Sequence, residues 1–180
     1  VMHGQWDWMR DPKIHSPTRE WDNASASEGW KFTHNYQHHT YTNVVGKDRD
    51  VGYGILRLSE EQRWSPYYLG NPLYNLLLSL FFEYGVALHD LDIEAIRKGE
   101  KDLTVLRRQL KQIARKIGRQ GFKDYLVYPA LTGPAFLHTL GANVTSNLVR
   151  NVWAYMIIFC GHFPDGAVHF SEEELEDETR

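Results

Sequence analysis

Three histidines stand within six residues of this chain, in the stretch HNYQHH from His34 to His39. On an α-helix His34 and His38 share one face because they are four residues apart, whereas His39 points about 100° away from His38. One turn would then present imidazoles in two directions, which favours two metal ions side by side, although one ion with a supporting histidine also fits. Imidazole ligands admit zinc, copper, iron or nickel. A solvated histidine cluster on the surface is the alternative.

The composition of the chain excludes several classes of function and of metal site. The net charge of −3 argues against a nucleic-acid-binding surface, and we expect no nucleic-acid partner. The single cysteine, Cys160, excludes an internal disulfide framework and a cysteine-based zinc site. Any metal site must therefore depend on histidine. The chain begins at Val1 and ends in an acidic run, SEEELEDETR, and we expect it to be an internal piece of a longer protein.

Polar and apolar residues are strongly segregated along the chain. Residues 1–70 are polar, and we expect them to form a cap, whereas residues 71–91 are apolar nearly all round. Glu83 would be costly at the centre of a bilayer, so we expect segment 71–91 to lie in the membrane interface as a helix. Residues 97–123 hold ten of the twenty Lys and Arg, with leucine and isoleucine at helical spacing. They predict a basic amphipathic helix near the membrane surface.

Residues 125–163 have about twice the length of one membrane crossing, which takes roughly 20 residues. We expect a hairpin of two membrane helices that turns near residues 141–147, where Gly, Asn, Thr and Ser cluster. The preceding basic block then lies on the cytoplasmic side, together with the histidines and the acidic segment 164–180. Two buried helices of a soluble protein are the alternative. The expected fold class is all-α, a membrane helical hairpin with a cytoplasmic helical cap.

Three stretches resemble the membrane fatty acid desaturases, in particular the bacterial acyl-chain type. They are HGQWDW from His3, HNYQHHTYTNVVGKDRDVGYG from His34 and FCGHFPDG from Phe159. The resemblance covers essentially the whole chain, and the second stretch is highly specific. It implies part of a four-span membrane fold whose cytoplasmic cap holds two non-haem iron ions in histidine boxes. It also implies a reaction in which dioxygen and two supplied electrons remove two hydrogens from an acyl chain.

The metal ligands implied by the resemblance come from different parts of the chain. The first box is represented by its second histidine alone, and its leading histidine would precede Val1. Ile158 stands where some relatives place an asparagine, and no third box of the form HxxHH is present. The implied ligands are His3, His34, His38, His39 and His162.

Other polar residues are assigned supporting roles. Asp48 and Asp50 are expected to orient ligand imidazoles by accepting hydrogen bonds from their second ring nitrogen, with a solvated turn as the alternative. The remaining histidines are interpreted as surface, hydrogen-bonding or packing residues; they are His15, His89, His138 and His169.

The function implied is an oxygen-dependent fatty acyl desaturase of the membrane. A methylene C–H bond is not acidic, so an oxidising metal centre rather than a base must break it. The implied partners are a fatty acyl thioester or lipid, membrane lipid, and an electron donor such as ferredoxin, rubredoxin or a cytochrome-type protein. The acyl carrier, the double-bond position and the identity of the donor have no recognisable signal in the sequence.

Two other functions fit the same residues. A di-iron hydroxylase would insert oxygen instead of removing the second hydrogen, and a non-enzymatic histidine-rich membrane protein would use its imidazoles as a pH switch. The five assigned ligands are about half of a two-ion site, and metal affinity depends on a complete, organised set of ligands. We therefore expect the 180-residue chain to be inactive by itself.

Overall fold

The computed structural model describes residues 23–164 and 166–176, and this part of the chain is helical. The only strand-like pairing within it is an isolated parallel bridge between Val44 and Phe170. The prediction of an all-α fold is confirmed for the described residues. In chain order the elements are α1 (Ser27–Trp30), η2 (Lys31–His38), η3 (Val51–Gly54), η4 (Pro66–Gly70), α2 (Asn71–Leu80), α3 (Phe82–His89), α4 (Ile93–Arg97), α5 (Leu103–Phe122), η5 (Lys123–Val127), α6 (Tyr128–Leu131), η6 (Gly133–Ala135), α7 (Phe136–His162) and α8 (Glu172–Glu176).

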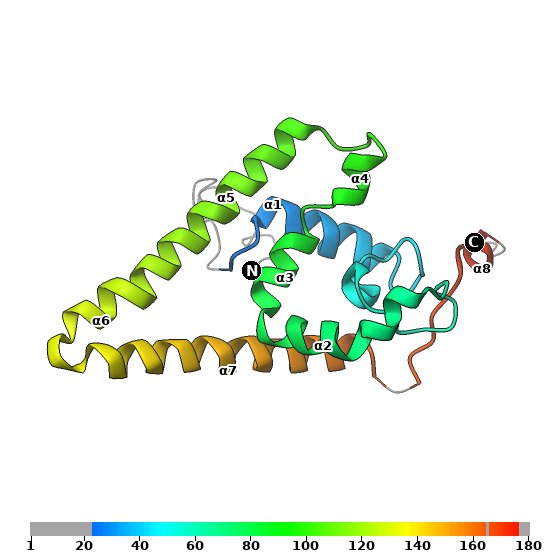
Figure 1. Ribbon diagram of the computed structural model, residues 1–180. Coiled ribbons are helices and arrows are strands. Elements are labelled where there is room, and N and C mark those ends of the chain that lie inside the picture. The colour runs from blue at the N-terminus through cyan, green and yellow to red at the C-terminus, as the bar shows by residue number, and fades with distance from the viewer. Residues whose placement is uncertain (1–22, 165, 177–180) are drawn as a thin grey trace, which may run out of the picture.

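Two long helical arms diverge from a tight turn (Figure 1). One arm runs through α5, η5 and α6, and the other is the 27-residue helix α7. The chain reverses at η6, where Gly133 adopts the left-handed φ of 54° that favours glycine. Pro134 follows at the start of the next turn, where its missing N–H costs no hydrogen bond. The prediction of a turn near residues 141–147 is wrong, because α7 runs unbroken through them.

The asparagines that suggested a turn join the two arms instead. Asn143 donates its side-chain amide to the carbonyl oxygen of Asp124 at 2.5 Å, and Asn147 donates to the hydroxyl of Tyr125 at 2.8 Å. Asparagine favours turns when its side chain bonds to the neighbouring backbone of its own segment. These two amides have partners on the opposite arm, so α7 keeps its helical backbone.

The apolar segment 71–91 forms two helices rather than one. Phe81, with φ −121° and ψ 30°, separates α2 from α3. Both helices pack against α7. Glu83 is buried in this packing, where Arg150 of α7 pairs with its carboxylate and the backbone N–H of Ala24 donates to it at 2.9 Å. These two partners allow the Glu83 carboxylate to be buried within the protein.

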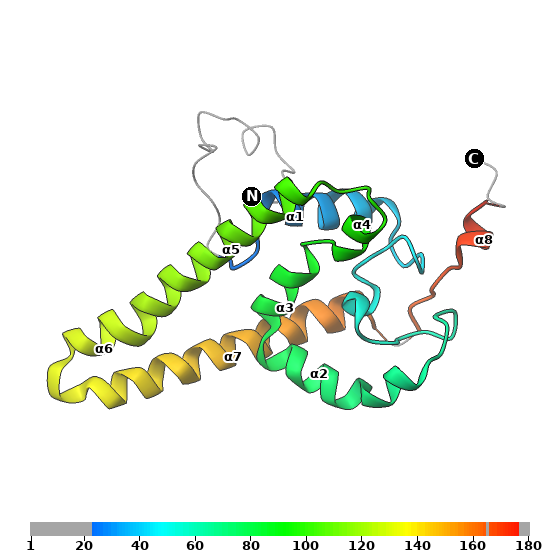
Figure 2. The ribbon, with the colours of Figure 1, turned by 45° about the horizontal axis from the view of Figure 1, so that its top comes forward.

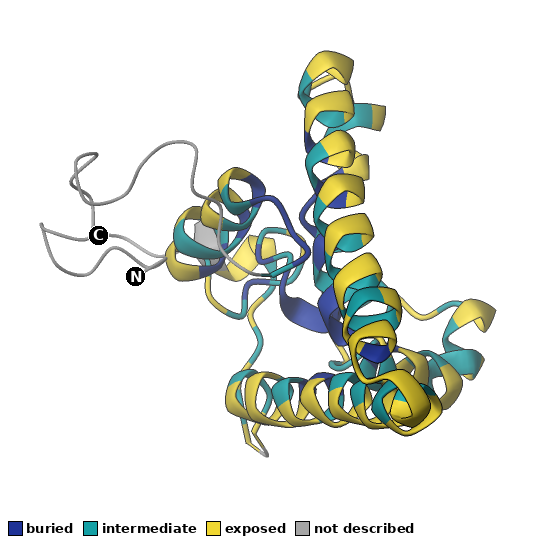
Figure 3. Ribbon diagram, turned by 90° about the vertical axis from the view of Figure 1, so that its left-hand side faces the viewer, coloured by how far each residue is buried: buried dark blue, intermediate teal, exposed yellow. Residues whose placement is uncertain are grey.

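Apolar side chains remain exposed along both arms, where Figure 3 shows long exposed stretches. Leu137 is 75% exposed and Trp153 is 65% exposed, both on α7. Among the described residues, no helix combines the length and the apolar character that a membrane crossing requires.

The segment that carries the histidines lies between the two arms, beside α3 (Figures 1 and 2). The hydroxyl of Thr33 in η2 donates to the Asp90 carboxylate at the end of α3, at 2.8 Å. At the same end of α3, Ala87 and Leu91 form a buried cluster with Ile113 of α5. This end of α3 therefore contacts both η2 and α5, and it holds η2 in place through a buried polar contact.

Asp90 gives this packing a measurable pH dependence. Burial raises the pKa of Asp90 to about 6 from the usual 3.8, because the charged carboxylate loses its water. The stabilising effect of its protonated form is complete below pH 3.8 and is lost as the pH rises through 6. Asp90→Asn keeps an oxygen that accepts from Thr33 and carries no charge. It should raise the free energy of unfolding by about 3 kcal/mol at pH 8 and leave it nearly unchanged at pH 3.

Unfolding curves measured from pH 3 to pH 8 test this expectation. Glu60→Gln, which neutralises an exposed carboxylate, is the control and should follow the wild-type profile. Parallel pH profiles for wild type and Asp90→Asn would show that Asp90 titrates normally in the folded protein.

Candidate metal centre

The histidine stretch forms a π-helix, not the α-helix assumed from its spacing. It is the element η2, with His39 directly after its last residue. Hydrogen bonds in a π-helix join residues five apart, so residues four and five positions after His34 both return to its side. The ring centroids of His38 and His39 lie 5.1 Å and 5.0 Å from that of His34. The expectation that His39 points away from the other two is therefore wrong, and all three imidazoles gather together.

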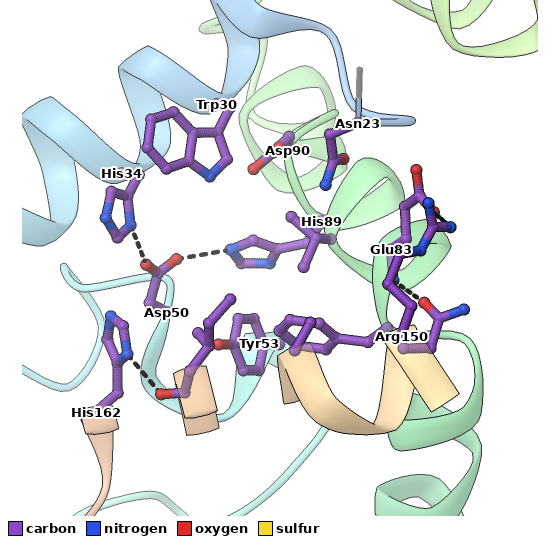
Figure 4. Close-up of a pocket in the computed structure, with 15 residues that line it drawn as sticks. Asn23, Trp30, His34, Asp50, Tyr53, Glu83, His89, Asp90, Arg150 and His162 are labelled. Carbon is purple, nitrogen blue, oxygen red and sulfur yellow. Dashed lines mark hydrogen bonds and ion pairs between the residues drawn. The ribbon is translucent and has the colours of Figure 1, made fainter. Parts of the chain in front are cut away.

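A fourth imidazole comes from the end of α7. The ring centroid of His162 lies 4.8 Å from that of His38 and 6.0 Å from that of His34. Its Nδ1 is 2.7 Å from the carbonyl oxygen of Ile158 (Figure 4). Because a carbonyl only accepts, Nδ1 is the donor and the neutral ring carries its lone pair on Nε2. The sequence placed His162 with the histidine stretch, and the structure brings them together.

Two aspartates in the loop after η2 hold two of the rings. His38 Nδ1 donates to Asp48 at 3.0 Å. His34 Nδ1 donates to Asp50 at 3.0 Å, as Figure 4 shows. The Asp48 carboxylate also accepts the backbone N–H groups of Asn43 at 2.9 Å and Asp50 at 3.0 Å, so the loop fixes its position. A carboxylate behind Nδ1 is the usual arrangement for a histidine that ligates a metal through Nε2. The solvated-turn alternative does not apply, since Asp48 and Asp50 are buried.

Four of these side chains meet the spacing of a metal site. One ligand atom from each lies within 4.8 Å of the others; the residues are His34, His38, Asp50 and His162. Nitrogen ligands with one carboxylate oxygen suit iron as well as other first-row metals, so the donor set fits an iron ion. His39 stands beside this group. His3 and His15 lie outside the described residues, and the part expected of His3 remains a prediction.

Charge at this position favours a cation. Burial alone would raise the pKa of Asp50, but its contacts with His34 and His89 outweigh burial and hold that pKa well below the usual value. Burial also opposes charge on His38, yet the hydrogen bond to Asp48 and the negative charges nearby raise its pKa. The loop thus places the ionised Asp50 carboxylate directly behind the His34 imidazole.

The histidines set aside in the sequence occupy three different environments. His89, at the end of α3, supports the site, because its Nε2 lies 3.3 Å from Asp50 and its ring meets Tyr53 edge-on at 5.6 Å. Its spacing of three residues from Val86, which lines the same cavity, puts both side chains on one face of α3, but the contact with Asp50 follows from the packing of α3. His138 is exposed on α7, and His169 stacks on Phe163. Neither of these two belongs to the four-residue group.

A cavity of about 600 Å³ opens beside the imidazoles and runs between α3 and α7. Phe82 and Val86 of α3 face it from one side, and Ala154 and Ile158 of α7 face it from the other. Its size and its largely apolar wall, with a few polar groups, match the usual small-molecule site. The arrangement can place an apolar chain against a metal ion held by the histidines.

Comparisons with curated proteins identify a family. The chain is 50% identical over 184 residues to the NADPH-dependent stearoyl-CoA 9-desaturase of two strains of Mycobacterium tuberculosis, a match that covers 100% of the chain and 43% of each relative. It is 38% identical over 72 residues to an sn-1 linoleoyl-lipid 6-desaturase of Synechocystis, which covers 39% of the chain and 20% of that relative. The chain therefore spans less than half the length of the curated relatives it matches. No family model and no solved structure matches it.

The histidine stretch, the aspartate loop and His162 all fall within the first match, because that match covers the whole chain. A further relative, an acyl-lipid (8-3)-desaturase of Mortierella alpina, is 26% identical over 96 residues, covering 52% of the chain and 21% of that relative. The resemblance predicted from the histidine motifs is confirmed, and the chain belongs to the fatty acid desaturase family.

Proposed function

We propose that the protein is an oxygen-dependent fatty acyl desaturase that introduces a double bond into an acyl chain at a histidine-ligated centre of two non-haem iron ions. The observation that carries the proposal is the meeting of four imidazoles, two of them backed by buried aspartates, beside an apolar cavity. Membership of the desaturase family supports the same reaction.

The substrate class and the source of electrons follow from the relatives. The two relatives that match the whole chain are named for stearoyl-CoA and for NADPH, so we assign a long-chain acyl thioester and electrons that derive from NADPH. A carrier such as ferredoxin, rubredoxin or a cytochrome-type protein would deliver these electrons. An acyl lipid is the less favoured substrate, since the lipid desaturases match a smaller part of the chain.

In this proposal the histidines and aspartates prepare a metal site before substrate arrives. His34, His38 and His162 would hold iron, with Asp50 as a further ligand or as the group that orients His34. His39 and His3 would serve the second ion. Bound iron, with dioxygen as co-substrate, would supply the oxidising power that is needed to break a methylene C–H bond, which is not acidic.

The cavity wall performs the second task, which is positioning. Apolar side chains of α3 and α7 bind an acyl chain without offering it hydrogen bonds, and they exclude water from its surface. Holding one carbon against the metal ligands turns an encounter in solution into a reaction within a complex. Which carbon reacts then depends on how far the chain can enter.

The location of the protein is part of the proposal. We propose that the narrow part of the hairpin, formed by η5, α6, η6 and α7, inserts into a membrane, and that α5 and the histidines lie on the cytoplasmic side. Exposed apolar residues on both arms, such as Leu131 and Leu137, support insertion. The concentration of Lys and Arg on α5 supports a cytoplasmic position for the wide end of the hairpin.

The ligand assignment predicts a joint loss of metal and activity. Replacing His34, His38 or His162 by Ala in the full-length protein should abolish desaturation and lower the iron content, because each change removes an imidazole from the cluster. Elemental analysis measures the iron, and mass spectrometry of the acyl products measures the double bond. His138→Ala, an exposed imidazole on α7, is the matched control and should retain both. Wild-type iron and turnover in all three variants would refute the assignment.

The aspartates behind the rings predict a graded effect on metal affinity. Asp48→Asn keeps the size of the side chain and an accepting oxygen but removes the charge that supports His38. Loss of such a partner should weaken iron binding by about 10-fold to 100-fold. Competition with a chelator measures the affinity, and Glu60→Gln, an exposed carboxylate, is the control. An unchanged affinity would mean that Asp48 has no influence on the metal.

The proposed orientation predicts which side of the membrane each segment faces. In a Cys160→Ser background, single cysteines at Thr40 and Glu173 should react with an impermeant thiol reagent from the cytoplasmic side. A cysteine at Ala135, in the turn between the arms, should react from the opposite side. Labelling of all three positions from one side would contradict insertion of the hairpin.

A further inference from the structure

The cavity beside the imidazoles ends at an ion pair whose carboxylate is buried and whose guanidinium is partly exposed. Figure 4 shows Glu83 and Arg150 at one end of the cavity, with His34, Asp50 and His162 at the other. The Arg150 guanidinium of α7 donates to the Glu83 carboxylate of α3. The Glu83 side chain is only 8% exposed, while that of Arg150 is 44% exposed. The pair joins the two helices that form the walls.

The polar groups at this end satisfy one another. The second carboxylate oxygen of Glu83 accepts the backbone N–H of Ala24 at 2.9 Å, and the backbone N–H of Glu83 donates to the Asn151 side chain at 2.9 Å. Asn151 in turn donates its amide to the carbonyl oxygen of Asn147 at 2.9 Å. Both oxygens of the Glu83 carboxylate thus have hydrogen-bond partners within the protein. Its negative charge disfavours the binding of an anionic head group at this end.

The space between the two ends has a definite length. Arg150, Ala154, Ile158 and His162 line the cavity at every fourth position of α7. The first and last of these are twelve residues apart, which corresponds to roughly 18 Å at about 1.5 Å per residue. Ala154 and Ile158, which lie between them in this row, are apolar, as are Phe82 and Val86 on the opposite wall. Polar groups of His89, Asp90 and Asn151 complete the lining. The apolar side chains can therefore accompany an acyl chain from the imidazoles towards the ion pair.

We propose that the Glu83–Arg150 pair is the stop that the methyl end of the acyl chain meets, and that it limits how many carbons fit beyond the reacting carbon. The inference rests on the proposed desaturase function and names a specificity determinant within it. A methyl group driven into this network would dehydrate or separate two charges without replacing their contacts, which is costly. Substrates whose methyl end is too long cannot then present the same carbon to the metal.

The test removes the charge pair and keeps an apolar wall. Removing Arg150 alone would leave the buried Glu83 carboxylate without its counter-charge, whereas replacing both partners by apolar residues leaves no buried charge behind. The double variant Glu83→Leu/Arg150→Met of the full-length protein should therefore fold and extend the cavity. Turnover of an acyl thioester two carbons longer than the preferred one, relative to the preferred one, should rise about tenfold, the order expected for burying two more methylenes.

A second variant tests the same length from the opposite direction. Ala154→Leu places a larger side chain on the path between the imidazoles and the pair, so the preferred chain should become shorter. The matched control Glu94→Leu/Lys98→Met removes an exposed ion pair, 2.9 Å long, between α4 and the residue that follows it, outside the cavity. It should leave the chain-length profile unchanged.

The outcomes separate this inference from the proposed function. If the wild type forms desaturated product and both cavity variants keep its chain-length profile, the ion pair is not the stop for the methyl end. The desaturase proposal would then stand. An equal rise in KM for every chain length in the double variant would show that the pair binds the head group instead, and would also overturn the stop. Absence of desaturated product from the wild-type protein would contradict both.

Discussion

The site depends on the contacts that the Asp50 carboxylate makes with two histidines. This carboxylate is buried, and it meets His34 of η2 on one oxygen and His89 of α3 on the other. A buried charge without partners costs several kcal/mol, so the carboxylate and both imidazoles must stay together for the chain to fold this way. One side chain thereby fixes the loop, the histidine helix and the end of α3 relative to one another.

Two other buried carboxylates extend the same principle through the molecule. Asp90 holds Thr33, and with it η2, against α3, while Glu83 joins α3 to α7 through Arg150. The last connection matters for the metal site, because α7 carries His162 at its end. Interactions of this kind add little net stability compared with apolar packing, but they permit few alternative arrangements. That property suits a site in which ligands from distant segments must meet within a few ångströms.

The sequence predicted the composition of the site better than its geometry. Spacing and resemblance placed His34, His38, His39 and His162 together and gave Asp48 and Asp50 a supporting position, and the structure brings all six side chains to one place. The sequence did not predict the π-helix, because the spacing of His34, His38 and His39 is equally compatible with an α-helix. The contact of His89 with Asp50 depends on how α3 packs, which no local pattern encodes. The turn was misplaced because Asn143 and Asn147 carry a turn signal whose actual partners lie on the opposite arm.

Arg150 shows how one helix can serve two environments. Arg150 is the one Lys, Arg, Asp or Glu on α7, and such a charge is tolerated in a medium of low polarity when it is paired, as it is here with Glu83. The exposed apolar residues of α7, such as Trp153 and Ile157, are offset around the helix from the row that lines the cavity. In the proposed orientation the outer face therefore meets lipid, while the inner face guides an acyl chain between the imidazoles and the ion pair. The same pairing that makes the charge tolerable also makes it an effective barrier to a methyl group.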